Sequence, residues 1–239
     1  MTQPPINFQT KTIVNFKNSA KSELELIRAF FDNKSDGFYV DVGANDPVIG
    51  SQTYHLEQLG WKGLLIEPLA YLADSLRANR RAAVAQYACS TPENHNKKLQ
   101  FLMAGVYSTL NKNPIAIGAN SSEYIEVTCK TLDSVLDEYG VNPNFDFISI
   151  DIEGHEMEMF KGFSFGKWQP ALVLLEDHVT NLEKHRHMKK NGYQLLMRTA
   201  MNSWYVPRSI GYKLSLYSRL QYFRKYYLGL LPRKLRYMR

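Results

Sequence analysis

The chain has 239 residues and a mass of 27.6 kDa, the size of one substantial domain. Hydrophobic residues make up 44% of it and charged residues 22%, which is typical of globular proteins and excludes disordered and fibrous classes. Its two cysteines, Cys89 and Cys129, are too few for a disulfide framework or a four-cysteine zinc site. The sequence begins without a signal segment and has no apolar run of 18 residues, so we expect a cytoplasmic protein.

The charges are divided unequally along the chain. Residues 1–183 contain all 23 acidic residues and 15 of the 29 basic residues, which gives this part a net charge of −8. The last 56 residues contain 14 basic residues and no acidic residue, which gives +14. This asymmetry predicts an acidic body with a basic end that binds a partner.

Helix and strand patterns alternate along the first half of the chain. Residues 22–31 have apolar side chains at helical spacing, and the short β-rich run 38–42 ends at Gly43, as a buried parallel strand does. The following elements are predicted as a helix over 51–59, a strand over 63–66, a helix over 69–79 and a strand near 84–88.

The second half continues this alternation after a less regular segment, 90–128, in which 99–103 and 124–127 are the best candidates for a hairpin. The elements predicted beyond it are a helix over 132–139 capped by Thr131, a strand over 145–150, a helix over 155–160, a strand over 171–175, a helix over 181–190 and an antiparallel pair, 192–197 with 203–206. The pattern predicts an α/β fold with a doubly wound, mostly parallel Rossmann-like sheet and a closing antiparallel strand over 1–207. A basic, amphipathic helical tail is expected over 208–239.

Polar residues gather where four of the predicted strands end. Ligands of doubly wound sheets bind beyond the carboxyl ends of the strands, so these residues are the candidates for a functional site. The four clusters are Asp41-Val-Gly-Ala-Asn-Asp46, Glu67-Pro68, Asp151-Ile-Glu-Gly-His-Glu156 and Glu176-Asp-His178.

The first two clusters predict a nucleoside site. Gly43 leaves room where the strand turns into a loop beside a ligand. Glu67 follows Asp41 by 26 residues, at the end of the second strand, where a carboxylate can accept hydrogen bonds from both ribose hydroxyls. Asn45-Asp46-Pro47 replaces the third glycine of a dinucleotide fingerprint, and the extra acids would repel a pyrophosphate. A positively charged cofactor with a ribose and no phosphate, such as S-adenosylmethionine, fits better.

Five motifs in this order resemble those of FkbM-type methyltransferases, class I enzymes that use S-adenosylmethionine. The motifs are Phe38-Tyr-Val-Asp-Val-Gly-Ala-Asn-Asp-Pro47, Gly60-Trp-Lys-Gly63, Ile66-Glu-Pro68, Lys130-Thr-Leu-Asp133 and Ser149-Ile-Asp-Ile-Glu-Gly-His-Glu156. The resemblance spans about residues 36–180.

The resemblance implies a division of the cofactor site among the strand ends. Asp41, Gly43 and Asn45 would surround the methionine part of S-adenosylmethionine, and Glu67 would bind its ribose. The adenine would be bordered by Ala88, Cys89 and Ser90. The cofactor-binding set also includes Asp46 and Pro68, which belong to the first two clusters.

The remaining acids suggest where the reaction takes place. Asp151 and Glu153 are two residues apart at a strand end, so their carboxylates point to the same side while the chain is extended. In the class I sheet order, their strand neighbours the one that ends at Glu176-Asp177. By analogy with related sugar O-methyltransferases, Asp151, Glu176 and Asp177 would bind Mg²⁺ or Mn²⁺. The alternative is an acid network that closes loops and binds the cofactor's ammonium group without metal.

The same cluster contains the candidates for acid–base catalysis. Glu153 is the preferred general base for removing a hydroxyl proton, and Asp151 is expected to take part beside it. His155 and His178 compete with Glu153 for the role of base.

These features together predict an O-methyltransferase that uses S-adenosylmethionine and acts on a hydroxyl of a sugar, glycan or glycolipid-type acceptor. Two alternatives remain open. An RNA methyltransferase would use the basic tail as a phosphate-binding arm, although the acidic body and the lack of a nucleic-acid module disfavour it. A non-catalytic nucleoside-binding protein would use the tail to dock a partner, but the intact acid set in 151–156 disfavours that role.

The tail is predicted to form an amphipathic helix. Helical geometry over 213–231 places six apolar residues on one stripe, flanked by Arg219 and Arg224: Leu216, Leu220, Phe223, Tyr227, Leu230 and Leu231. We expect residues 213–236 to hold the protein peripherally at an anionic membrane surface, at the inner face of a membrane. The alternatives are packing of the stripe on the protein's own sheet or across a homodimer, and binding of RNA.

Overall fold

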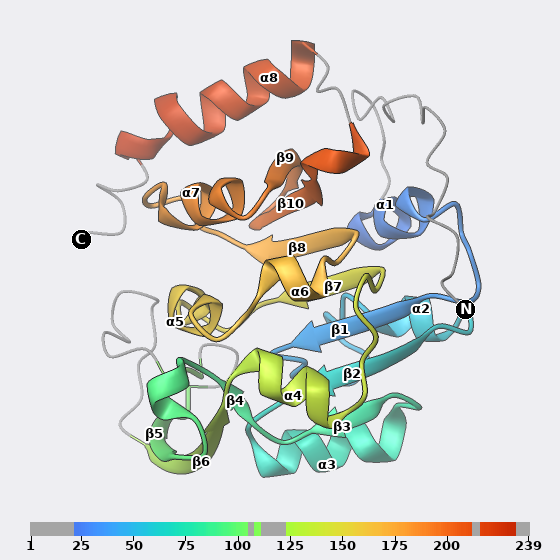
Figure 1. Cartoon of the computed structure of the whole chain (residues 1–239), viewed down its shortest axis with the longest axis vertical. Helices are drawn as coiled ribbons and strands as arrows, with labels where there is room; N and C mark the ends of the chain where they lie inside the picture. The colour runs from blue at the N-terminus through green and yellow to red at the C-terminus, as the bar shows by residue number, and fades with distance from the viewer. Residues whose placement is uncertain (1–21, 105–107, 111–122, 212–215, 233–239) are drawn as a thin grey trace.

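The structure, a computed structural model, describes residues 22–104, 108–110, 123–211 and 216–232. A seven-stranded sheet with helices on both faces forms its centre (Figure 1). The strand order is β3-β2-β1-β7-β8-β10-β9. The strands are β1 (Phe38–Val42), β2 (Lys62–Ile66), β3 (Ala83–Ala85), β7 (Phe147–Ile150), β8 (Leu172–Glu176), β9 (Tyr193–Thr199) and β10 (Asn202–Pro207).

The predicted α/β fold is confirmed, including its closing antiparallel pair. In this sheet, β3, β2, β1, β7 and β8 run parallel to one another. The strand β10 runs antiparallel to both β8 and β9. Parallel strands direct their carboxyl ends to one edge of the sheet, so the predicted polar clusters after β1, β2, β7 and β8 lie at the same edge.

Each face of the sheet is covered by its own set of helices. Alternate residues of β1 separate the two cores, because Tyr39 packs on one face and Val40 on the other. The Tyr39 face is covered by α1 (Glu23–Phe30), α2 (Tyr54–Glu57) and α3 (Ala70–Asn79). The Val40 face is covered by α4 (Leu132–Glu138), α5 (Glu156–Phe160), α6 (Phe165–Trp168) and α7 (Glu183–Lys190).

A second, three-stranded sheet follows β3. Its order is β4 (Ala88–Cys89), β6 (Tyr124–Lys130) and β5 (Lys98–Leu102), and β5 pairs antiparallel with β6 as the hairpin prediction required. A short 3₁₀ turn, Pro92–Asn94, lies between β4 and β5. The strand predicted near 84–88 is instead divided between the two sheets, since β3 and β4 pair with different partners.

Two local predictions show how side chains decide helix ends. Thr131 caps α4 as predicted, and its hydroxyl accepts the backbone N–H of Ser134 at 3.2 Å. The helix expected over 51–59 is limited to α2, because the preceding residues form a loop that Arg80 holds through the Pro47 carbonyl.

The tail begins with a 3₁₀ turn, Arg208–Ile210, and continues in α8 (Leu216–Tyr222) and a π-helical segment, Phe223–Leu228. This helix lies beyond β9, at the top of Figure 1. None of the helices within the described ranges is both long and apolar enough to cross a bilayer.

Candidate active site

A cavity of about 390 Å³ lies at the carboxyl ends of β1, β2 and β7. This volume is within the range of small-molecule sites. The described residues that line it include five acids and no lysine or arginine, and the acids are Asp41, Asp46, Glu67, Asp151 and Glu153. The predicted cofactor cluster and the predicted catalytic cluster therefore face one cavity.

Gly43 is required by the close approach of two strand ends. Its φ is +85°, and a Cβ placed on it would lie 1.9 Å from the Asp151 carbonyl oxygen. The sequence predicts that this glycine makes room for a ligand. The structure gives a more immediate reason, since the backbone after β7 occupies the space a side chain would need.

Glu67 fastens the loop after β1 to the end of β2. Its two carboxylate oxygens accept the backbone N–H groups of Asn45 at 3.0 Å and Leu69 at 2.9 Å. Only 4% of Glu67 is exposed, and this burial raises its pKa to about 7. Each carboxylate oxygen retains a second acceptor site, and the residue lines the cavity, so Glu67 can still accept ligand hydroxyls.

The other two acids of the first loop also have local partners. The Thr53 hydroxyl donates to the buried Asp41 carboxylate at 2.7 Å, and burial raises the pKa of Asp41. Asp46 accepts the N–H groups of Val48 at 2.8 Å and Ile49 at 2.6 Å, and these bonds lower the pKa of Asp46. Both acids therefore shape the loop as well as line the cavity.

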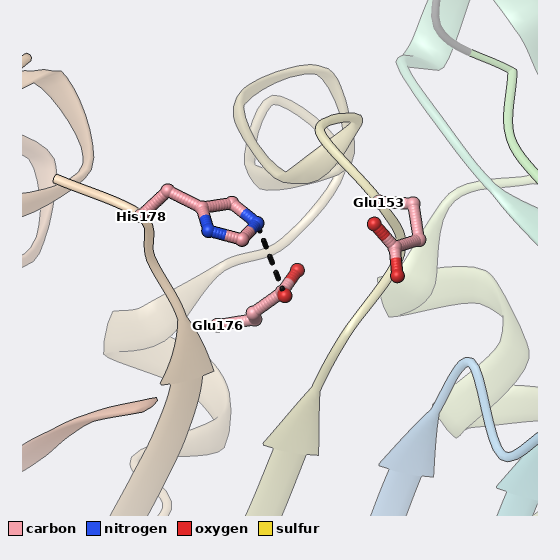
Figure 2. Close-up of side chains that lie close together, drawn as sticks. All are labelled: Glu153, Glu176 and His178. Carbon is pink, nitrogen blue, oxygen red and sulfur yellow. Dashed lines mark ion pairs between the residues drawn. The ribbon is translucent and has the colours of Figure 1, made fainter. Parts of the chain in front are cut away.

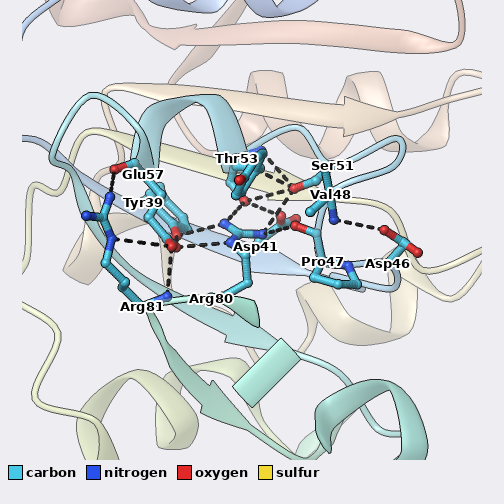
Figure 3. A network of polar contacts seen from close by, with 11 residues as sticks. Tyr39, Asp41, Asp46, Pro47, Val48, Ser51, Thr53, Glu57, Arg80 and Arg81 are labelled. Carbon is cyan, nitrogen blue, oxygen red and sulfur yellow. Dashed lines mark hydrogen bonds and ion pairs between the residues drawn. The ribbon is translucent and has the colours of Figure 1, made fainter. Parts of the chain in front are cut away.

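Arg80 organises this loop from the end of α3 (Figure 3). Its side chain is fully buried and forms an ion pair with Glu57, with 3.0 Å between Nε and Oε2. All five of its N–H donors are used. The acceptors, at 2.9 to 3.3 Å, are the Glu57 carboxylate, the hydroxyls of Tyr39, Ser51 and Thr53, and the Pro47 carbonyl. Sequence analysis did not identify Arg80, and its position beside Arg81 at a helix end was the single local signal.

The predicted adenine border is divided in the structure. Ala88 and Cys89 line the cavity, as does Pro68, whereas Ser90 is fully buried and is not among the lining residues. The Ser90 hydroxyl lies 3.0 Å from His155 Nε2, and burial lowers the pKa of His155. His155 lines the cavity with a ring that Ser90 orients.

Glu153, Glu176 and His178 point toward one another beyond the cavity edge (Figure 2). One carboxylate oxygen from each glutamate and one ring nitrogen of His178 all lie within 4.8 Å of one another. His178 Nε2 and Glu176 Oε1 are 3.3 Å apart, and this contact raises the pKa of His178. We refer to these three residues as the acid–histidine cluster.

Glu153 is the member of the cluster that faces the cavity. Its backbone is left-handed, with φ +50°, and its Oε2 is buried without a hydrogen-bond partner among the residues the structure describes. Burial and the neighbouring Glu176 raise the pKa of Glu153 to about 7. A carboxylate with that pKa and an unpartnered oxygen, on a residue that lines the cavity, can take a proton from a ligand near neutral pH.

Asp151 also faces the cavity and is open to it. The protein packed around it and the carboxylates of Glu176 and Glu153 raise the pKa of Asp151. Lys184, which the sequence analysis did not identify, is a cation that contacts two of the neighbouring acidic residues. Its ammonium group is 2.7 Å from the buried Glu156 carboxylate and donates to the Glu176 carbonyl at 2.9 Å.

Asp177 does not join Glu176 in this cluster. Its Oδ1 accepts the Val179 N–H at 2.9 Å, and its Oδ2 accepts the Tyr226 hydroxyl at 3.4 Å. Glu176 thus lies with Glu153 and His178, and its carboxyl group also forms a hydrogen bond with that of Asp151. Of the predicted metal set of Asp151, Glu176 and Asp177, only Asp177 is separated from the others. Adjacent residues at a strand end point to opposite sides, which explains why Asp177 turns away.

Comparison with known proteins identifies a family whose model matches most of the chain. The family model for the methyltransferase FkbM domain matches residues 41–196. No curated protein matches the chain.

Two solved structures are similar at low identity. The precorrin-6Y C5,15-methyltransferase from Geobacter metallireducens GS-15 is 10% identical, with a TM-score of 0.42 over 77% of this chain and 84% of that one. The C-terminal domain of the precorrin-6Y C5,15-methyltransferase from Rhodobacter capsulatus is 13% identical, with a TM-score of 0.36 over 76% and 80%.

Proposed function

This chain belongs to the FkbM methyltransferase family, and on this premise we propose that it transfers a methyl group from S-adenosylmethionine to a hydroxyl of a sugar, glycan or glycolipid. The observation that carries the proposal is the cavity lining, which contains five acids and no lysine or arginine among the described residues. Such a lining favours a cationic ligand and repels phosphates.

The residues at the ends of β1 and β2 fit this cofactor, which supplies a methyl group on a sulfonium centre when bound. Glu67 would accept the ribose hydroxyls, because its carboxylate lines the cavity and is already held by two backbone N–H groups. The loop of Asp41, Gly43 and Asn45 would border the methionine part. Ala88 and Cys89 would border the adenine.

On the acceptor side, Glu153 would remove the hydroxyl proton. A sugar hydroxyl is a weak nucleophile at neutral pH, so a positioned base accelerates its reaction. Glu153 lines the cavity, and it has an unpartnered carboxylate oxygen and a pKa near 7, as this role needs. Glu176 and His178 would set the pKa of Glu153, since the Glu176 charge raises it and the His178 charge lowers it.

A divalent cation is a second candidate for the same cluster. Glu153 and Glu176 offer carboxylate oxygens, which suit Mg²⁺ and Mn²⁺, whereas the imidazole of His178 suits a transition-metal ion better than Mg²⁺. A cation held there would polarise the acceptor hydroxyl. We favour the metal-free base, because the ion pair with His178 already compensates Glu176.

Calorimetry tests the cofactor assignment. The full chain should bind S-adenosylmethionine and not NAD⁺, and Glu67→Gln should weaken binding by about 5- to 150-fold, equivalent to roughly 1–3 kcal/mol. Glu126→Gln, at an exposed position on β6, serves as the matched control and should bind normally. Binding of NAD⁺, or unchanged affinity in Glu67→Gln, would contradict the assignment.

The acceptor is tested separately. The enzyme and S-adenosylmethionine are incubated with glycan, glycolipid and RNA fractions of a cell extract, and the gain of a methyl group is followed by mass spectrometry. We expect the glycan or glycolipid fraction to gain it. Methylation confined to RNA would refute the acceptor class and leave the cofactor assignment intact.

A further inference from the structure

The tail helix has two apolar faces, and just one of them packs on the protein. Tyr222, Tyr226 and Leu230 pack against the core, and Tyr226 is fully buried. The next residue after each of these, Phe223, Tyr227 and Leu231, belongs to the stripe predicted from the sequence. Residues one apart on an α-helix point in directions about 100° apart, so the predicted stripe lies beside the packed face and shares Leu230 with it.

The packed face is held by a set of specific polar contacts. The Tyr226 hydroxyl lies 2.7 Å from the Ser203 hydroxyl and donates to Asp177 at 3.4 Å. The Tyr222 hydroxyl lies 2.8 Å from His185 Nε2, and the other nitrogen of that ring lies 3.1 Å from the Tyr205 hydroxyl. These contacts fix the rotation of the helix about its axis, and therefore fix which side chains face outward.

The outward face is apolar and exposed. Leu216 is 79% exposed, Leu220 67% and Leu231 67%, and Phe223 and Tyr227 are about half exposed. Arg219 and Arg224, on the same helix, are also exposed. Of the six residues of the stripe predicted from the sequence, Leu230 packs on the protein's own core, and the other five are exposed.

We propose that this face, defined by Leu216, Leu220, Phe223, Tyr227 and Leu231, is a docking surface for an anionic lipid membrane. Leucine and aromatic side chains beside exposed arginines are the composition of helices that lie in the membrane interface. Every residue after Glu183 is neutral or basic, so an anionic surface attracts this end and repels the acidic body. The body and the tail together orient the molecule with the tail helix against the lipid.

The same charges disfavour two other occupants. A second copy that paired helix to helix would bring together two segments with 14 basic residues and no acid each, which repel. RNA would use the arginines but would leave the exposed leucines in water, whereas a bilayer buries both kinds of side chain. The proposal is independent of the methylated acceptor, because it depends on the surface and not on the cavity.

Vesicle co-sedimentation of the full chain tests the proposal. The protein should bind vesicles that contain phosphatidylglycerol at low salt and lose most of that binding at high salt or with phosphatidylcholine alone. Arg219→Gln/Arg224→Gln should weaken binding by about 30-fold, at about 1 kcal/mol for each arginine. Leu220→Ser/Phe223→Ser/Leu231→Ser should weaken it by at least about tenfold.

A matched control removes the same charge elsewhere. Lys97 and Lys98 are exposed near β5, at the opposite end of the molecule from α8 (Figure 1). Lys97→Gln/Lys98→Gln should bind vesicles nearly as the wild type does. Because all substituted side chains are exposed, unfolding temperatures should stay within a few degrees of the wild type, which excludes misfolding as the cause.

Three results would overturn the proposal. The first is no binding of the full chain to phosphatidylglycerol vesicles at low salt. The second is a shift from dimer to monomer in Leu220→Ser/Phe223→Ser/Leu231→Ser, which would identify a second copy as the occupant. The third is vesicle binding that falls equally in the Lys97→Gln/Lys98→Gln control, which would indicate unspecific charge attraction.

Discussion

Two groups of acidic side chains, one around Glu57 and one around Glu153, differ in how the protein compensates their charge. Around the first loop, Glu57 accepts hydrogen bonds from Arg80, Tyr39 and the Arg81 backbone (Figure 3). Burial acts to raise the pKa of Glu57, but these bonds and the charge of Arg80 outweigh it and lower the pKa. The Glu57 carboxylate therefore has partners for both of its oxygens, and its contacts with Arg80 stabilise the loop after β1.

The second group is left partly uncompensated. Glu153 (Figure 2) has a buried oxygen without a partner among the described residues and a pKa raised to about 7. The pKa of the nearby Asp151 is also raised. A carboxylate that costs stability in this way is typical of a site that uses its acid. The comparison teaches that a buried acid paired with an arginine supports the fold, as Glu57 does, whereas a buried acid with a raised pKa that faces the cavity, such as Glu153 or Glu67, is available to a ligand.

The largest expected effect tests the uncompensated group. Glu153→Gln should lower kcat by about 10²- to 10⁴-fold, because the amide cannot accept the acceptor's proton. In the wild type, kcat should rise with pH through about 7 as Glu153 loses its proton, and this limb should be absent in the variant. Glu158→Gln on the exposed side of α5 is the control, since Glu158 pairs with Lys161 and does not line the cavity. A wild-type rate in Glu153→Gln would assign the base elsewhere.

The next effect concerns the compensated group. Arg80→Gln should lower the free energy of unfolding by about 3–5 kcal/mol, because it leaves the buried Glu57 carboxylate without its cation. Chemical denaturation measures this loss. Arg77→Gln, on the same helix, removes an exposed pair with Asp74 and should cost less than about 1 kcal/mol. Similar losses in the two variants would show that the Arg80 network is not a structural support.

The difference between the two groups also explains what the sequence could predict. The strand ends were predictable because hydrophobic runs such as 147–150 are local, and so was the edge of the sheet at which their polar residues gather. The partners of Arg80 lie 23 to 41 residues away, so no local pattern indicates them. Only the fold brings them together.

The position of His178 beside Glu176 was predictable from the alternation of side chains along an extended chain. The i, i+2 spacing, which the sequence analysis applied to Asp151 and Glu153, describes the extended residues after β8, where it places Glu176 with His178 and turns Asp177 away. The division of the tail helix into a packed face and an exposed face was harder to predict from the sequence. Both faces are apolar, and the selection of Tyr226 depends on Ser203 and Asp177 from distant elements.

A smaller effect concerns the raised pKa of Glu67, which makes the free energy of unfolding depend on pH. Glu67 has a pKa of about 7 in the folded chain against an ordinary 4.5, so the folded state holds more protons between these values. Stability therefore falls as pH rises through this window, and the cost is fully present above about pH 7. The fall in the free energy of unfolding between about pH 5 and pH 8 should be smaller by roughly 1–3 kcal/mol in Glu67→Gln. An identical fall in both proteins would mean that Glu67 does not titrate in this window.

The smallest expected effect separates the two candidates for the acid–histidine cluster. If Glu153 acts alone, EDTA should leave turnover unchanged, and added Mg²⁺ or Mn²⁺ should not raise it, since no step depends on a cation. If Glu153, Glu176 and His178 bind a cation, EDTA should abolish turnover and Mn²⁺ should restore it.

The variant His178→Gln distinguishes the metal-free base from the metal site by a second measurement. Without metal, removal of the charged partner of Glu176 should move the pH limb of kcat upward, because Glu153 then lies beside an uncompensated carboxylate. If His178→Gln instead loses Mn²⁺ affinity and the pH dependence of kcat does not change, the acid–histidine cluster is a metal site. The partner of the Glu153 carboxylate is then the metal ion.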